Sequence, residues 1–121
     1  MTKRILVVED QEDNRQILRD LLGSVGHEMI EAHDGEAAVA QAAKHKPDLI
    51  LMDIQLPVMD GYEATRRIKA NPELNAIPII VVTSYALSGD EEKARAAGCD
   101  AYVTKPYSPR QLLAKLNEFL K

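Results

Sequence analysis

Acidic side chains follow two apolar runs of the chain, at the point where each run ends. Glu9 and Asp10 come directly after residues 4–8, and Asp53 comes directly after residues 49–52. An apolar run without alternation is typical of a strand that is buried on both faces of a parallel sheet. Ligands of such sheets bind outside the carboxyl ends of the strands. We therefore expect these carboxylates to lie together at one edge of a sheet.

The acidic cluster predicts a cation. Neighbouring carboxylates repel one another, which raises their proton affinity unless a cation neutralises them. Hard oxygen ligands of this kind suit Mg²⁺, which binds through a small number of carboxylates and keeps several waters. We expect Asp10 to hold the ion directly and Glu9 to hold it directly or through water. The backbone carbonyl of Gln55 is a further candidate oxygen.

The same strand ends carry groups suited to phosphoryl transfer, which needs an in-line nucleophile and neutralisation of charge on the transferred oxygens. Asp53 is the candidate nucleophile, because its place at a strand end aims a carboxylate oxygen outward and would give an acyl phosphate. Thr83 follows the apolar residues 79–82, and Lys105 follows the run 101–103. Their hydroxyl and ammonium groups suit two phosphoryl oxygens.

Helix-forming segments alternate with the strand-like runs. The first expected helix is capped by Asp13 or Asn14 and ends before Gly26, and Ser108 caps the last. Parallel strands need crossover helices between them, and these crossovers are right-handed. The pattern therefore predicts a three-layer α/β domain of five strands and five helices. The expected strands are 4–8, 27–32, 49–52, 79–82 and 101–103, and the later helices are 36–44, 62–70, 90–97 and 109–120.

Composition limits the remaining possibilities. The chain has 121 residues, so we expect one domain over residues 1–121. The net charge is −4 and the basic residues are scattered, which argues against nucleic acid as a partner. The apolar runs are too short to cross a membrane. Only one cysteine, Cys99, is present, and the start of the chain leaves no room for a secretory signal, so we expect a cytoplasmic protein.

Taken together, these motifs resemble the receiver domain of two-component response regulators over essentially the whole chain. The resemblance implies a flavodoxin-like (CheY-like) sandwich with strand order 2-1-3-4-5 and a cis Lys105-Pro106 bond. It also implies that Asp53 is the phosphoacceptor and that Mg²⁺ is held by Glu9, Asp10, Asp53 and the Gln55 carbonyl. The matching motifs are Val8-Glu9-Asp10, Asp53 with Leu56-Pro57-Val58-Met59-Asp60-Gly61, Val82-Thr83-Ser84 and Lys105-Pro106.

The resemblance further implies a switch and its partners. Thr83 would move toward the phosphoryl group, and Tyr102 would turn inward into the vacated space. The donor would be a histidine kinase or a histidine phosphotransfer protein, docking on residues 11–15, Leu18 and the Pro106 loop, and the output a downstream protein target. We expect a monomer or a weak, phosphorylation-dependent dimer. Tyr85, two residues beyond Thr83, favours a long-lived acyl phosphate if it shields the site.

Other functions are weighed against the switch. The chain is either a complete single-domain regulator, which its Met1 start favours, or a receiver fragment of a larger regulator or hybrid kinase. An aspartate-nucleophile phosphatase would use similar chemistry, but such enzymes carry a second acid where this chain has Gln55, and no cap domain is present. A flavodoxin-like electron carrier is disfavoured because no phosphate-binding loop follows the first strand and tryptophan is absent. We therefore expect a signalling protein and not an enzyme.

Overall fold

A five-stranded parallel sheet forms the centre of the molecule, whose computed structural model describes residues 2–83 and 90–120. The strand order is β2-β1-β3-β4-β5, and every neighbouring pair is parallel. This confirms the predicted fold class and strand order. The strands are β1 (Arg4–Val8), β2 (Glu28–Ala32), β3 (Leu49–Asp53), β4 (Ile79–Thr83) and β5 (Ala101–Thr104).

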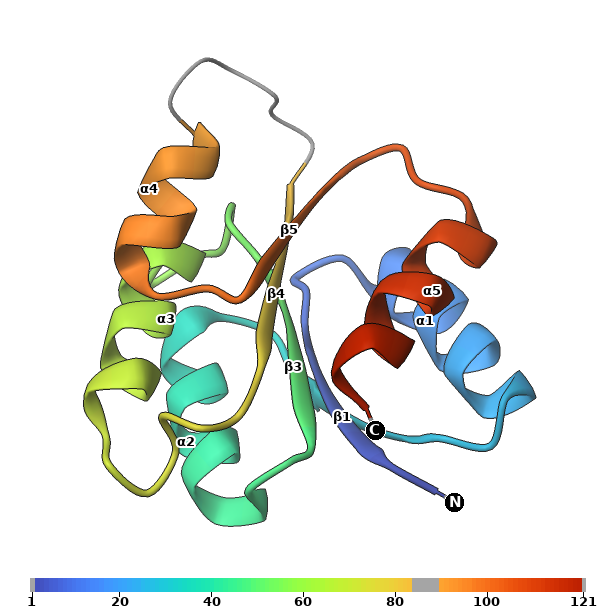
Figure 1. Ribbon diagram of the computed structural model, residues 1–121, viewed down its shortest axis with the longest axis horizontal. Coiled ribbons are helices and arrows are strands. Elements are labelled where there is room, and N and C mark those ends of the chain that lie inside the picture. The colour runs from blue at the N-terminus through green and yellow to red at the C-terminus, as the bar shows by residue number, and fades with distance from the viewer. Residues whose placement is uncertain (1, 84–89, 121) are drawn as a thin grey trace.

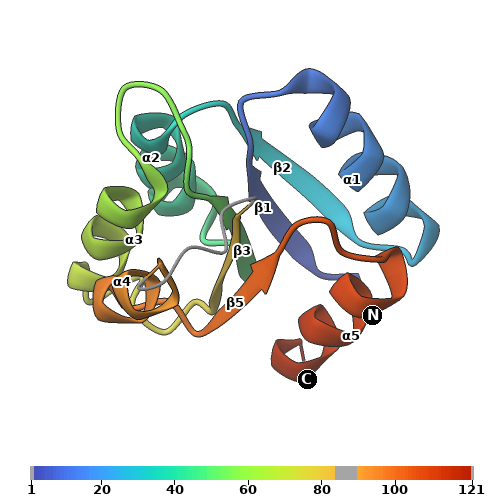
Figure 2. The same ribbon diagram turned by 90° about the horizontal axis from the view of Figure 1, so that it is seen from above.

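Helices cover both faces of the sheet and make the outer two layers. Figure 1 shows α1 and α5 on one side of the strands and α2, α3 and α4 on the other, and Figure 2 shows the same three layers from above. Each crossover returns the chain so that the next strand runs parallel, as the alternating pattern predicts. The helices are α1 (Glu12–Ser24), α2 (Gly35–His45), α3 (Gly61–Ala70), α4 (Asp90–Ala97) and α5 (Pro109–Phe119).

The apolar strands build two cores, one on each face of the sheet. Alternate residues of β1 and β3, such as Leu6 and Ile50, pack toward α2, α3 and α4. The residues between them, such as Val7 and Leu51, pack toward α1 and α5. Both faces are buried, which is why these strands are continuously apolar. Strand β2 lies at the edge of the sheet, and only Ala32 of its five residues is fully buried.

Helix termini agree with the sequence except at α1. Ser108 forms a capping box with Gln111, and Gly26 has a φ of +83° just beyond α1, as expected. The predicted cap of α1 at Asp13 or Asn14 is wrong, because the helix begins at Glu12 with Gln11 as its N-cap. Asn14 instead donates its side-chain amide to Glu9. In the part of the chain that the structure describes, no helix has both the length and the apolar character needed to cross a bilayer.

Candidate functional site

The three predicted acids meet at the carboxyl edge of the sheet. Val8 of β1 pairs with Met52 of β3, so the residues that follow them, Glu9 and Asp53, lie side by side at the ends of neighbouring strands. Glu9, Asp10 and Asp53 each offer a carboxylate oxygen, and these oxygens lie within 4.8 Å of one another. Glu9 is buried, Asp53 is half-buried and Asp10 is exposed. The cluster therefore opens to solvent on the Asp10 side.

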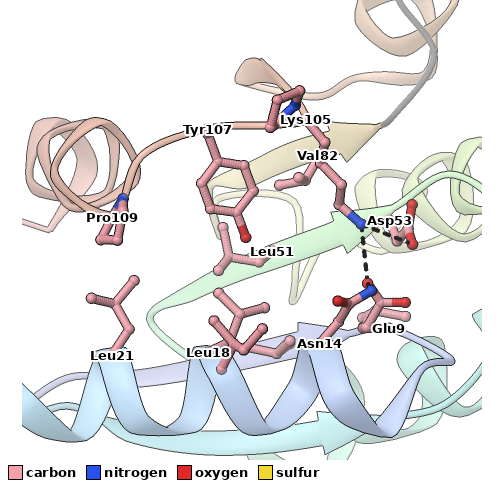
Figure 3. Close-up of a pocket in the computed structure, with 14 residues that line it drawn as sticks. Glu9, Asn14, Leu18, Leu21, Leu51, Asp53, Val82, Lys105, Tyr107 and Pro109 are labelled. Atoms are coloured by element: carbon pink, nitrogen blue, oxygen red, sulfur yellow. Dashed lines mark hydrogen bonds and ion pairs between the residues drawn. The ribbon is translucent and has the colours of Figure 1, made fainter.

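Lys105 supplies the positive charge of this site. Its Nζ lies 3.1 Å from Glu9 Oε1 and 3.6 Å from Asp53 Oδ2, and Figure 3 shows the side chain extended toward both acids. The backbone N–H of Lys105 donates to the carbonyl of Thr83 at 2.7 Å, which ties the end of β5 to the end of β4. The Lys105-Pro106 bond is cis, as predicted.

Burial and charge shift the acids in opposite directions. Burial raises the pKa of Asp53 to about 6, against the lowering effect of Lys105 and with a further increase from Glu9. The pKa of Glu9 is lowered: burial opposes this, but the Gln11 N–H and Lys105 outweigh it. Lys105 likewise has a raised pKa, since Asp53 and Glu9 outweigh its burial. A single ammonium group thus leaves Asp53 short of compensating charge, and the site suits an added cation.

Thr83 and Tyr102 lie on the neighbouring strands β4 and β5. Thr83 ends β4, with 2% of its surface exposed, one residue beyond the Val82 that pairs with Asp53. Tyr102 is half-buried and packs against the core beneath α2, α3 and α4. Their movement on phosphorylation stays a prediction. The predicted shielding residue Tyr85 and the motif residue Ser84 lie outside the described residues.

The connection between β3 and α3 packs against the backbone of Asp53. The N–H of Gly61 donates to the carbonyl of Ile54 at 2.9 Å, and the Asp60 side chain caps α3 by accepting from the Glu63 N–H. A Cβ atom on Gly61 would lie only 2.0 Å from the backbone oxygen of Asp53. The first turn of α3 therefore packs directly against the backbone of Asp53. The sequence places Asp60 and Gly61 in a family motif but does not indicate this close approach.

A groove runs from the acids along the face between α1 and α5. The cavity measures about 560 Å³ and includes Glu9, Asp53 and Lys105 at one end. Its remaining walls are mainly apolar and come from strands β1, β3 and β4, from α1 and from the segment before α5. Figure 3 shows Tyr107 extending from that segment across the cavity toward α1. Leu18 and Pro106, two of the expected donor contacts, both line this groove.

Four of the predicted site residues therefore lie together, whereas no contact among the described residues tests the predicted role of Gln55. Glu9, Asp10 and Asp53 form the acidic cluster, and Lys105 joins it by ion pairs. Gln55 has an exposed side chain two residues beyond Asp53, and the use of its carbonyl as a ligand stays a prediction. Sequence reasoning missed the contact of Asn14 with Glu9, because a polar residue near a helix start is more often a cap.

The comparisons with known proteins decide the family. The model of the response regulator receiver domain matches residues 5–117. The chain belongs to this family. It is 45% identical over 120 residues to the polar-differentiation response regulator DivK of Brucella ovis, and the same holds for DivK of Brucella melitensis. These matches span 99% of the chain and 98% of each relative.

Solved receiver structures have the same fold. The receiver domain of a sensor histidine kinase from Pseudomonas aeruginosa PAO1 superposes with a TM-score of 0.92 at 38% identity, covering 99% of this chain and 98% of that one. That structure has a magnesium ion coordinated in its active site cleft. The chemotaxis response regulator CheY4 of Vibrio cholerae also gives a TM-score of 0.92, at 29% identity, over 99% of this chain and all of that one. The predicted family, with its CheY-like fold, is thus confirmed.

Proposed function

We propose that this receiver domain accepts a phosphoryl group on Asp53 from a phosphohistidine protein and signals by changing its protein contacts. The observation that carries the proposal is the juxtaposition of three carboxylates within 4.8 Å of one another and of Lys105 beside two of them. The donor is a histidine kinase or a histidine phosphotransfer protein, and residues 1–121 act as one domain in the cytoplasm. Family membership supports this class of donor.

The donor set at the site fits Mg²⁺. Glu9, Asp10 and Asp53 provide only carboxylate oxygens, which are hard ligands, and the exposed side of the cluster leaves room for waters. The Gln55 carbonyl would add a further oxygen. When bound, Mg²⁺ supplies positive charge that offsets the acids and the transferred phosphoryl oxygens. A magnesium-containing receiver structure at 38% identity supports the same assignment here.

Asp53 performs the bond-forming step in this proposal. One carboxylate oxygen attacks the phosphorus in line as the P–N bond to the donor histidine breaks, and the electron pair of that bond stays on the imidazole nitrogen. The product is an acyl phosphate on Asp53. Lys105 turns from the carboxylates to a phosphoryl oxygen, and the Thr83 hydroxyl binds a second one. Removing the Lys105 ammonium group or the Thr83 hydroxyl would slow the transfer. Loss of the Thr83 hydroxyl would also remove the contact between the phosphoryl group and β4.

The output is a change of packing and not a turnover reaction. We propose that Thr83 draws the end of β4 toward the acyl phosphate and that Tyr102 then moves further inward, which alters the face beside β5. Gln55 stands where aspartate-nucleophile phosphatases carry a second acid, which supports a switch over an enzyme. The protein would act as a monomer or form a weak dimer only when phosphorylated.

The direct test is phosphorylation followed by mass measurement. The protein is mixed with a phosphohistidine donor and Mg²⁺, and its intact mass is then recorded. We expect one added group of roughly 80 Da, and peptide mapping should place it on Asp53. Asp53→Asn should remain unlabelled, whereas the control Asp20→Asn, on the exposed side of α1, should be labelled like the wild type. Labelling at another residue, or continuous release of phosphate, would contradict the proposal.

A further inference from the structure

Arg15 on α1 is a buried charge that contacts the acidic site from behind. Among the residues whose exposure is described, only two charged side chains are buried, Glu9 at 3% exposure and Arg15 at 5%. Burying a guanidinium is unfavourable unless it is paired and hydrogen-bonded. Arg15 forms ion pairs with Glu12 and Glu31, and it also donates to the backbone carbonyl of Glu9.

The guanidinium joins three elements around the β1–α1 connection. Nη1 donates to the backbone carbonyl of Glu9 at 2.7 Å, and Nη2 donates to Glu12 Oε2 at 2.6 Å. Nε lies 3.2 Å from Glu31 Oε1 of β2, an ion-pair distance, although its N–H makes no aligned hydrogen bond. A guanidinium is a planar fork with fixed donor directions, so contacts on three sides leave it little freedom to turn.

The contact with the Glu9 carbonyl matters because of what that carbonyl belongs to. It is part of the peptide unit that joins Glu9 to Asp10, and a peptide unit is rigid and planar. Fixing its oxygen therefore restricts the positions of the Cα atoms of Glu9 and Asp10, from which the two side chains extend. The Glu9 carboxylate is oriented separately, by the Gln11 N–H at 3.2 Å and the Asn14 amide at 3.1 Å.

We propose that Arg15 is a positioning residue of the cation site, and this inference rests on the proposed function. By holding the peptide between Glu9 and Asp10, it fixes the backbone from which both carboxylates extend. Glu12 and Glu31 hold Arg15 in turn, so the edge strand β2 supports the site through a side chain that touches neither the cation nor the phosphoryl group.

The same helix offers a matched control. Arg19 lies one turn further along α1 and shares two of the partners, with Nη2 at 2.6 Å from Glu31 Oε1 and 3.7 Å from Glu12 Oε1. Among the described residues, the hydrogen bonds and ion pairs of Arg19 go to Gln16, Glu12 and Glu31 and not to Glu9. Replacing Arg19 by methionine therefore makes the same change of charge and size as Arg15→Met. It disturbs the same ionic network but leaves the Glu9 peptide held.

The experiment measures Mg²⁺ binding by titration calorimetry and the free energy of unfolding in EDTA for each protein. Outer partners of metal ligands typically contribute 10- to 100-fold to metal affinity, and we expect Arg15→Met to weaken Mg²⁺ binding about 10-fold. Arg19→Met should bind Mg²⁺ like the wild type. Arg15→Lys keeps the charge but cannot reach three partners at once, so its affinity should fall between those of Arg15→Met and the wild type.

The outcomes separate this inference from the proposed function. Wild-type affinity in Arg15→Met, or an equal loss in Arg19→Met, would overturn the positioning role while leaving the function intact. A wild-type protein that binds no Mg²⁺ would overturn the proposed function and this inference with it. If Arg15→Met does not fold, Arg15→Lys and Glu31→Gln take its place, and an unchanged affinity in both would equally reject the role.

Discussion

At the scale of single residues, the central feature of the site is Asp53, whose ionised form is disfavoured by burial. Asp53 is half-buried between the buried Glu9 and the partly buried Lys105, and its pKa of about 6 means that the fold opposes its ionisation. An aspartate whose ionised form is energetically disfavoured is suited to bind a cation and to accept a phosphoryl group. Reactivity and instability therefore come from the same carboxylate.

This state predicts that Asp53→Asn stabilises the metal-free protein at pH 7. The folded-state pKa of about 6 lies above the ordinary value of 3.8, so the ionised carboxylate destabilises the fold fully above pH 6. The penalty fades as the pH falls from 6 toward 3.8, because the folded protein then takes up the proton first. A shift of this size corresponds to at most about 3 kcal/mol.

Urea unfolding in EDTA at pH 7.5 and pH 4 measures this difference. The Asn variant should be more stable by roughly 1 to 3 kcal/mol at the higher pH, and the gain should shrink at the lower pH. Glu9, whose pKa moves in the opposite direction, is present in both proteins and largely cancels. A gain that is independent of pH would reject the explanation by charge.

At the scale of elements, the connection from β3 to α3 determines where Asp53 stands. Gly61 allows α3 to begin against the Asp53 backbone, since even a methyl group would come within 2.0 Å of its carbonyl oxygen. Val58 in the same loop has a φ of +69°, which is strained for a β-branched side chain, and is 78% exposed. Close packing therefore requires glycine at position 61. Val58, in contrast, has a strained backbone although its side chain is exposed.

Gly61→Ala should destabilise the protein and displace Asp53, the proposed phosphoacceptor. Forcing a methyl group into a filled space typically costs about 1 to 3 kcal/mol, and the atoms that must move here belong to Asp53. Both the free energy of unfolding and the rate of phosphorylation should fall. Gly23→Ala in α1 is the control, because its Cβ would meet nothing within 4 Å. That substitution should stabilise the helix by about 0.5 to 1 kcal/mol and leave the rate unchanged.

Val58→Asn should raise the free energy of unfolding. Asparagine adopts positive φ more readily than valine, and relief of such strain contributes of order 1 kcal/mol. Val25→Asn is the comparison, since Val25 is also exposed, at 46%, but has an ordinary φ of −108°. Chemical denaturation of both variants should show a gain only at position 58. Equal changes at the two sites would show that the backbone of Val58 stores no strain.

At the scale of the whole molecule, the charged groups of the candidate site gather at one end of the sheet, and an apolar core on each face of the sheet stabilises the fold. Any cation that binds the acids of the native state stabilises the entire fold by mass action, in proportion to RT ln(1 + [L]/Kd). Folding and the chemistry of the site are therefore linked through the ends of β1 and β3.

Mg²⁺ should accordingly raise the melting temperature of the wild-type protein. At one hundred times its Kd, the ion would add about 2.7 kcal/mol, and the increase should continue with each further decade of concentration. Asp10→Asn removes the exposed carboxylate of the acidic cluster and should lose most of this increase without unfolding the protein. Differential scanning calorimetry in MgCl₂ and in NaCl of equal ionic strength tests it. Equal shifts in the two salts would indicate screening instead of binding.

Much of this arrangement follows from residues that can be recognised in the chain. Continuous apolar runs that end in Glu9 and Asp53 predict buried parallel strands with a shared ligand edge, and the structure has them. The start of α1 was predicted two or three residues late, because Asn14 contacts Glu9 instead of capping the helix. The buried Arg15 was not predicted either, since a charged residue on an amphipathic helix is ordinarily solvated. Both errors concern polar contacts that exist only once distant segments have come together.

Tyr107 lines the groove, so the ultraviolet absorption of its ring reports on the environment there. The chain has four tyrosines and no tryptophan, so its near-ultraviolet signal comes from few rings. Burial raises the pKa of Tyr107, Lys105 opposes this increase, and Glu9 and Asp53 add to it, so the ring lies within the electric field of the site. Subtracting the spectrum of Tyr107→Phe would isolate this single chromophore. The protein thereby carries its own spectroscopic probe of charge at the strand ends, without an attached dye.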